Sequence, residues 1–228
     1  MPKLSLKRLI LPLLLIAIVL LWNTPVIYPL KILVVFFHEM SHALATLLTG
    51  GSVQEMEVTL FQGGHVLSSG GSRFIILNAG YLGSLIIGAT IYLLALHTRW
   101  DRTVSALLGV IILIISLLFV RNLFGFIFGV ISGGGLLLLA RYSNESINDM
   151  VLRVVGLTSM IYVPLDIFSD TISRSYLRSD ARMLAEEFGG ATLLWGSIWI
   201  IISVLIVYKV VKTKTPLSTQ KEQQNPLI

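Results

Sequence analysis

The chain has 228 residues, of which 55% are hydrophobic and only 13% charged, with a net charge of +5. A water-soluble domain of this size could not bury so much apolar surface, so the composition excludes a soluble globular protein and predicts a membrane protein. The basic residues mostly flank apolar segments, as is ordinary in membrane proteins, and we expect no nucleic-acid partner. The sequence contains no cysteine, which excludes disulfides and thiolate metal ligands.

The N-terminal segment MPKLSLKRLILPLLLIAIVLLW has basic residues followed by an apolar run, like a signal peptide. No small-residue cleavage site follows, because the chain continues Asn23-Thr24-Pro25. We therefore expect a retained membrane anchor rather than a cleaved signal.

Seven apolar segments each approach the roughly 20 residues needed to cross the hydrocarbon core of a bilayer. They are Leu9–Tyr28, Leu30–Leu48, Phe74–Leu96, Thr103–Val120, Leu123–Ala140, Val151–Ile167 and Ala191–Val211. We predict an all-α polytopic membrane protein, a bundle of about six to seven transmembrane helices that forms one domain over residues 1–211. Residues 212–228 are polar and are expected to form a disordered tail. Basic residues divide almost evenly between the two sides, so charge does not determine the orientation.

The second apolar segment contains the motif H-E-x-x-H. A helix places residues i and i+4 on one face, so His38 and His42 can bind one metal ion, with Glu39 beside it to accept a proton from an activated water molecule. A hydrogen-bonded cluster without metal is the alternative. Ionisable residues at this depth are costly and are usually functional, so we predict a Zn2+ site with Glu39 as the general base.

The segment TGGSVQEMEVTLFQGGHVLSSGGS separates the second and third spans. Apolar residues alternate in its first half, and the glycine pairs are strong turn signals, so we predict a small β-hairpin after the zinc-motif helix. An unwound substrate could add to this hairpin as a further strand, which makes Val58 and Leu60 candidate substrate-binding residues.

Asn78 lies in the apolar sequence FIILNAGYLGSLIIGA of the third span. A buried amide in a span usually forms a hydrogen bond to a neighbouring helix, and Gly80, Gly83 and Gly88 allow helices to approach closely. The functional alternative is that Asn78 holds a substrate strand or lines the active site, so it is included as a candidate substrate-binding residue.

A catalytic zinc site usually has three protein ligands and one open position, so two histidines do not complete it. The best further candidates lie in IYVPLDIFSDTI. Asp166 is the predicted third ligand, because Pro164 should kink the helix and turn this carboxylate inward, and Asp170 is the alternative. Both could instead face water at the end of a span, as we expect for Asp180. His65 on the hairpin is a weaker candidate.

With these residues identified, the chain resembles the site-2 protease family of intramembrane zinc metalloproteases, in particular its small bacterial, B-type-like branch. The matching segments are FFHEMSHALATLLTGG, the glycine-rich hairpin, LNAGYLGSLIIGA, and IYVPLDIFSDTISRSYLRSDA followed by WGSIWIIIS. The resemblance implies a zinc ion bound by His38, His42 and an aspartate of a later helix, which Asp166 matches. The family's Asn-Pro-x-x-x-x-Asp-Gly form is absent, since Ile167 follows Asp166, and the choice between Asp166 and Asp170 therefore stays open.

The resemblance further implies hydrolysis of a peptide bond in or near the transmembrane segment of a membrane-protein substrate, within a bacterial cell membrane. The expected partners are that substrate and the lipid bilayer. The alternative is a non-proteolytic membrane protein, either an inactive relative that binds other membrane proteins or a metal carrier. A carrier should show polar residues along a whole transmembrane route, and an inactive binder would often have lost Glu39 or a motif histidine.

Overall fold

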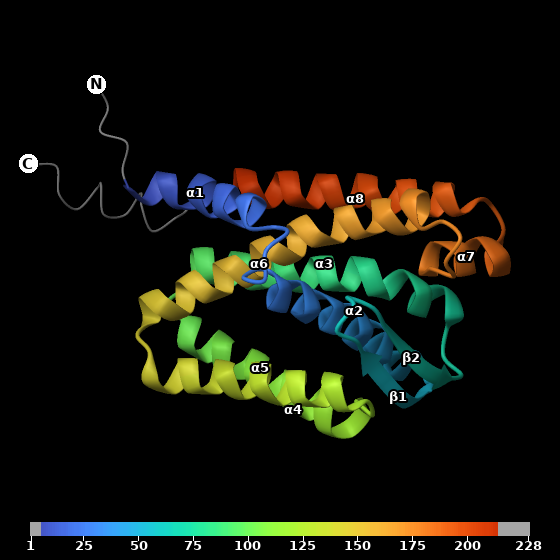
Figure 1. Ribbon diagram of the computed structural model, residues 1–228, viewed down its shortest axis with the longest axis horizontal. Helices are drawn as coiled ribbons and strands as arrows, with labels where there is room; N and C mark the ends of the chain where they lie inside the picture. The colour runs from blue at the N-terminus through green and yellow to red at the C-terminus, as the bar shows by residue number, and fades with distance from the viewer. Residues whose placement is uncertain (1–5, 214–228) are drawn as a thin grey trace, which may run out of the picture.

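The computed structural model describes residues 6–213, with side chains described from residue 12 onward. Most of the predicted disordered tail, residues 214–228, lies outside this range. Within it, helices and one hairpin follow one another along the chain (Figure 1). The elements are α1 (Leu6–Leu20), α2 (Tyr28–Leu48), β1 (Ser52–Val58), β2 (Gly64–Ser69), α3 (Arg73–His97), α4 (Asp101–Phe119), α5 (Leu123–Tyr142), α6 (Glu145–Phe168), the π-helical turn η1 (Ser169–Ser173), α7 (Asp180–Phe188) and α8 (Thr192–Lys212).

Six helical segments of the described chain are long and apolar enough to cross a membrane: α2, α3, α4, α5, α6 with η1, and α8. The predicted helical membrane bundle with a small hairpin is therefore confirmed, and the protein is a multi-pass membrane protein. The predicted first span, Leu9–Tyr28, is too long. Helix α1 has 15 residues and ends at Leu20, because the chain then turns, with Thr24 donating a hydrogen bond to the carbonyl of Leu21.

Helix α2 is the most buried of the six candidate spans and lies at the centre of the bundle. Helices α3 and α6 flank it, the pair α4 and α5 lies on one side, and α1 and α8 lie on the other (Figure 1). Glycines of α3 permit this packing. A Cβ on Gly88 would lie 2.7 Å from Oγ of Ser159 in α6, and a Cβ on Gly83 would overlap Ser41 in α2. The predicted close approach of the helices at these glycines is confirmed.

Strands β1 and β2 form an antiparallel hairpin that packs against α2, with Val58 opposite Gly64. The outer edge of β1 is already occupied by the linker between α4 and α5. The backbone amide of Arg121 donates to the carbonyl of Met56 at 3.1 Å. The side-chain amide of Asn122 accepts from the Val58 N–H at 3.2 Å and donates to its carbonyl at 2.7 Å. Among the described residues, the outer edge of β2 has no strand partner.

After α6, the chain turns back and brings α7 close to α2. The helix continues through Pro164 and widens into η1, and a short connection then leads to α7. The Ser179 side chain caps α7 by accepting a hydrogen bond from the backbone amide of Arg182, so the helix begins at Asp180. Helix α7 packs against α3 and α8, which fixes where its first residue lies.

Candidate metal centre

The two motif histidines lie one helical turn apart on α2 and point to the same place. Their Nε2 atoms are 3.0 Å apart, and the two rings meet edge to face with centroids 4.7 Å apart. Because residues i and i+4 share a helix face, this pairing follows directly from the sequence spacing.

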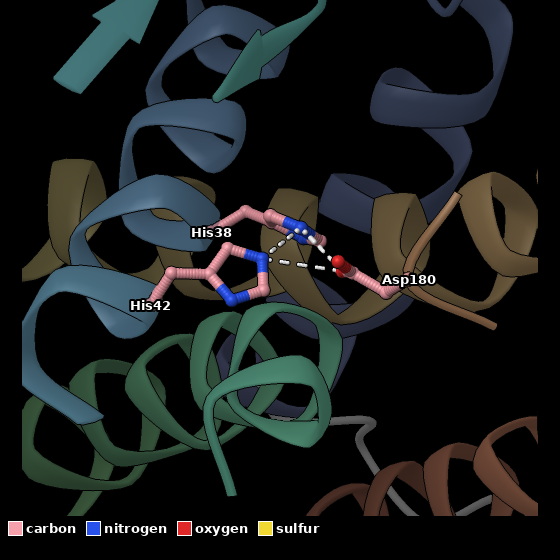
Figure 2. A group of neighbouring side chains, drawn as sticks. All are labelled: His38, His42 and Asp180. Carbon is pink, nitrogen blue, oxygen red and sulfur yellow. Dashed lines mark hydrogen bonds and ion pairs between the residues drawn. The ribbon is translucent and has the colours of Figure 1, made fainter. Parts of the chain in front are cut away.

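Asp180 completes the group from the far end of the chain (Figure 2). Its Oδ2 atom lies 3.1 Å from Nε2 of His38 and 3.2 Å from Nε2 of His42. Zinc bonds to nitrogen and oxygen of about 2.0–2.1 Å would separate tetrahedral ligand atoms by about 3.3 Å. The spacing of the three atoms, and the combination of two imidazoles with one carboxylate, therefore fit a zinc ion.

The structure brings neither Asp166 nor Asp170 into this group. Both carboxylates instead contact the Arg174 guanidinium, at 3.0 and 2.7 Å respectively. Asp170 also accepts a hydrogen bond from the Tyr81 hydroxyl. The carboxylate beside the histidines is Asp180, and the expectation that Asp180 faces water is wrong, since its side chain is only 8% exposed.

The sequence offered a weak signal for Asp180. Ser179 followed by Asp180 is an ordinary helix start, because serine caps a helix and a negative charge is favourable in the first turn. The same pattern occurs at the ends of many helices that carry no site. Only the packing of α7 against α3 shows that this aspartate points inward.

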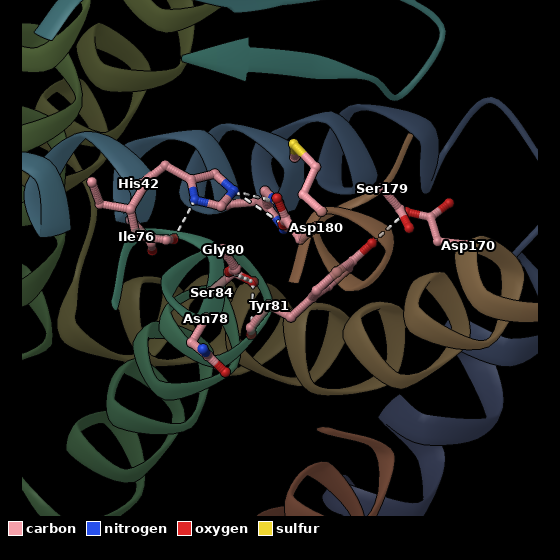
Figure 3. A network of polar contacts seen from close by, with 12 residues as sticks. His42, Ile76, Asn78, Gly80, Tyr81, Ser84, Asp170, Ser179 and Asp180 are labelled. Carbon is pink, nitrogen blue, oxygen red and sulfur yellow. Dashed lines mark hydrogen bonds and ion pairs between the residues drawn. The ribbon is translucent and has the colours of Figure 1, made fainter. Parts of the chain in front are cut away.

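The imidazole of His42 is held by the backbone of α3. Its Nδ1 lies 2.7 Å from the carbonyl oxygen of Ile76 (Figure 3). A carbonyl can only accept, so Nδ1 carries a proton, and Nε2, which faces Asp180, is the ring nitrogen left to bind a metal. Gly80, one turn later in α3, leaves room for the rings: a Cβ there would lie 2.5 Å from Nε2 of His42 and would overlap His38. The edge of the Tyr81 ring packs on His38 with centroids 4.6 Å apart.

The charge state of Asp180 suits a metal ligand. Burial alone would raise the pKa of its carboxyl, but the charge of His42 and the hydrogen bonds from both histidines outweigh burial and lower the pKa well below its ordinary value. The carboxyl is therefore ionised over the whole physiological pH range, as metal binding requires.

Glu39 is buried beside the two histidines and lines the same cavity, which has a volume of about 410 Å³. The first residue of β2 lies directly over it: a Cβ on Gly64 would lie 2.7 Å from Oε1 of Glu39. No hydrogen bond or ion pair ties the Glu39 carboxylate to any other side chain from residue 12 to residue 213. The carboxylate is thus next to the candidate ligands, faces the cavity and is available to a water molecule or substrate.

The other predicted site residues are not part of the group formed by His38, His42 and Asp180. The Asn78 amide accepts a hydrogen bond from Nε1 of the buried Trp199 at 2.9 Å and donates to the carbonyl of Phe74 at 2.8 Å, which supports its helix-to-helix role. Val58, the last residue of β1, is fully buried, whereas Leu60 in the hairpin turn is half-exposed. His65 lines the cavity and is exposed, with its ring nitrogens 3.7 and 3.8 Å from two hairpin glutamates.

Comparison with protein-family models matches residues 11–210 to the Peptidase M50B-like family. The match covers most of the chain and includes the H-E-x-x-H helix, the hairpin and Asp180. Comparison with curated proteins and with solved structures found no match.

Proposed function

Because the chain belongs to the Peptidase M50B-like family, we propose that it is a zinc-dependent intramembrane endopeptidase, which cuts membrane-protein substrates in or near a transmembrane segment. The family match confirms the resemblance to site-2 proteases. The observation that carries the proposal is the convergence of His38, His42 and Asp180 beside Glu39, inside a cavity between candidate membrane spans.

His38, His42 and Asp180 would hold the zinc ion. When bound, zinc supplies Lewis acidity that activates a water molecule and polarises the scissile carbonyl. Two contacts favour metal binding before the ion enters. The Ile76 carbonyl keeps a proton on Nδ1 of His42, and the histidines keep Asp180 ionised. Little reorganisation is then needed when the ion enters.

Glu39 would act as the general base. Its carboxylate is buried, has no partner among the described side chains, and lies on the same helical turn as the two histidines. It can therefore accept a proton from the attacking water and later deliver that proton to the leaving amine.

The substrate would bind along the hairpin in an unwound form. An intact helix engages its peptide groups in i→i−4 hydrogen bonds, so a transmembrane substrate must open locally before it can be cut. The sequence pattern favoured the strand around Val58 and Leu60, but the outer edge of β1 is occupied by Arg121 and Asn122. The free edge is that of β2, whose residues Gly64–Val66 line the cavity, and we assign strand addition to that edge.

The test uses the purified full-length protein in phosphatidylcholine nanodiscs, mixed with a library of single-span peptides. Products sequenced by mass spectrometry should show cleavage that disappears in the Glu39→Gln variant and on zinc chelation. A zinc-loaded wild type that cuts no peptide would instead favour an inactive relative that binds membrane proteins. Zinc transport into sealed vesicles, retained by Glu39→Gln, would favour a metal carrier.

A further inference from the structure

A second cavity, of about 500 Å³, lies at the N-terminal end of α2. Residues of the connection between α1 and α2 form one wall, and the hairpin turn forms another. Its lining includes Trp22, Tyr28, Lys31 and Gln62. Gln62 also lines the first cavity, which contains Glu39 and the two histidines and is called the catalytic cavity below. The two cavities therefore share a wall at the hairpin turn. Tyr28 fixes that turn by donating a hydrogen bond to the carbonyl of Leu60 at 2.5 Å.

Lys31 is the one charged residue that lines this cavity, and among the described residues no carboxylate pairs with it. The residue is 7% exposed, and its Nζ lies 4.4 Å above the centre of the Trp22 ring. In the described part of the chain, no carboxylate pairs with it and no hydrogen bond satisfies its ammonium group. The stem of Lys31 is buried and the residue lines the cavity, where the cation–π contact with Trp22 gives its charge less stabilisation than a carboxylate would.

The surroundings of Lys31 add to the positive potential. It lies in the first turn of α2, where the unpaired amides of a helix favour an anion. Nearby, Gln62 has a left-handed backbone with φ of 58°, a conformation that residues other than glycine seldom adopt. The lining of the cavity is thus mostly apolar with one positive charge, and one wall is a hairpin turn that Tyr28 holds in place.

We propose that the second cavity binds an acidic side chain of the substrate, and that Lys31 thereby selects which sequences are cut. This inference rests on the proposed proteolytic function. Lys31 precedes His38 by seven residues, which is about 10 Å along a helix. An extended strand covers that distance in roughly three residues. A substrate strand that pairs with β2 and continues beyond Gly64, past the hairpin turn, would therefore place a side chain about three residues from the scissile bond beside Lys31.

Because Gln62 lines both cavities, a substrate strand that left the first cavity past the hairpin turn would reach the second one, which favours a substrate side chain over a lipid headgroup. A carboxylate would replace the missing counter-charge with a charge-assisted hydrogen bond. The neutral amide of asparagine or glutamine offers an oxygen of similar shape but no charge, and it is the appropriate comparison.

The experiment uses the full-length protein in phosphatidylcholine nanodiscs and a library of single-span peptides randomised near the cut. Wild type should enrich Asp or Glu over Asn or Gln by about tenfold or more at one position about three residues from the scissile bond. Lys31→Met should abolish this enrichment, and Lys31→Glu should reverse it toward Lys and Arg. Lys212→Met is the matched control, since Lys212 also lies over an aromatic ring, that of Tyr208 at 4.3 Å, but lines neither cavity.

A second readout separates failure of this inference from failure of the proposed function. Binding of a Glu-containing peptide and its Gln twin is measured with Glu39→Gln protein, which needs no cleavage. The Glu peptide should bind about tenfold more tightly, and only when Lys31 is present. Equal binding of the two peptides, or acidic enrichment that survives in Lys31→Met, would overturn the inference even if cleavage is normal. Phosphatidylglycerol retained by wild type but lost from Lys31→Met in native mass spectrometry would also overturn it, by assigning the cavity to a lipid.

Discussion

Oδ2 of Asp180 lies 3.1 Å from Nε2 of His38, although 142 residues separate them in the sequence. The candidate centre therefore joins α2 to a short helix outside the candidate spans, and its integrity depends on how α7 packs. A zinc ion bound there would link these distant segments and should stabilise the folded protein, because a ligand that binds only the native state shifts the folding equilibrium toward it.

The first prediction concerns the third ligand. Asp180→Ala should lower zinc affinity by at least about 100-fold, since losing groups that merely support metal ligands already costs about 10- to 100-fold. Asp166→Asn and Asp170→Asn should keep full zinc content, because both carboxylates contact Arg174 instead. Elemental analysis of the purified variants decides this, with circular dichroism to confirm that each is folded. Zinc lost from Asp166→Asn but kept in Asp180→Ala would return the ligand role to Asp166.

The second prediction concerns the general base. Glu39→Gln should retain zinc but lower the cleavage rate by about 100- to 10,000-fold, because an amide cannot accept the proton. Glu186→Gln, at a solvent-facing position of α7, is the matched control and should cut at the wild-type rate. Turnover and zinc content are measured on the same preparations. Near wild-type turnover in Glu39→Gln would contradict the assignment.

The third prediction concerns the glycine opposite the histidine pair. Gly80→Ala should lose zinc, because the added methyl group overlaps both imidazole rings. This loss is expected even though alanine favours a helix over glycine by about 1 kcal/mol. Gly134→Ala is the control, since open space surrounds that position, and it should be neutral or slightly stabilising. If Gly80→Ala binds zinc normally, the rings have more freedom than their packing against α3 indicates.

The fourth prediction concerns the contact that holds β1 in place. Asn122→Ala removes both hydrogen bonds to the backbone of Val58 and should destabilise the protein by about 1–3 kcal/mol. Hydrogen exchange should rise in the hairpin first. Gln54→Ala changes an exposed amide of the same strand and should stay within about 0.5 kcal/mol of wild type. Unfolding in denaturing detergent measures both variants, and equal midpoints would show that the linker does not hold the hairpin.

The fold changes which edge of the hairpin we propose for addition of a substrate strand. Alternating apolar residues predicted the hairpin correctly, but the same alternation buries Val58 against the protein. Which edge of a two-stranded sheet stays free depends on what packs beside it. Here that neighbour is the α4–α5 linker, more than 60 residues further along the chain, and no local pattern in β1 reveals it.

The sequence by itself determined the features that depend on local spacing. Apolar length predicted the six long helices that can span a membrane, although it overestimated the first segment, and the i, i+4 rule placed His38 and His42 together with Glu39 beside them. Only the tertiary structure decided that Asp180, rather than Asp166, meets those histidines. The physical reason is that a carboxylate's position relative to another helix depends on where η1 ends, where Ser179 caps α7 and how α7 packs against α3. Those three conditions are met together only in the folded chain.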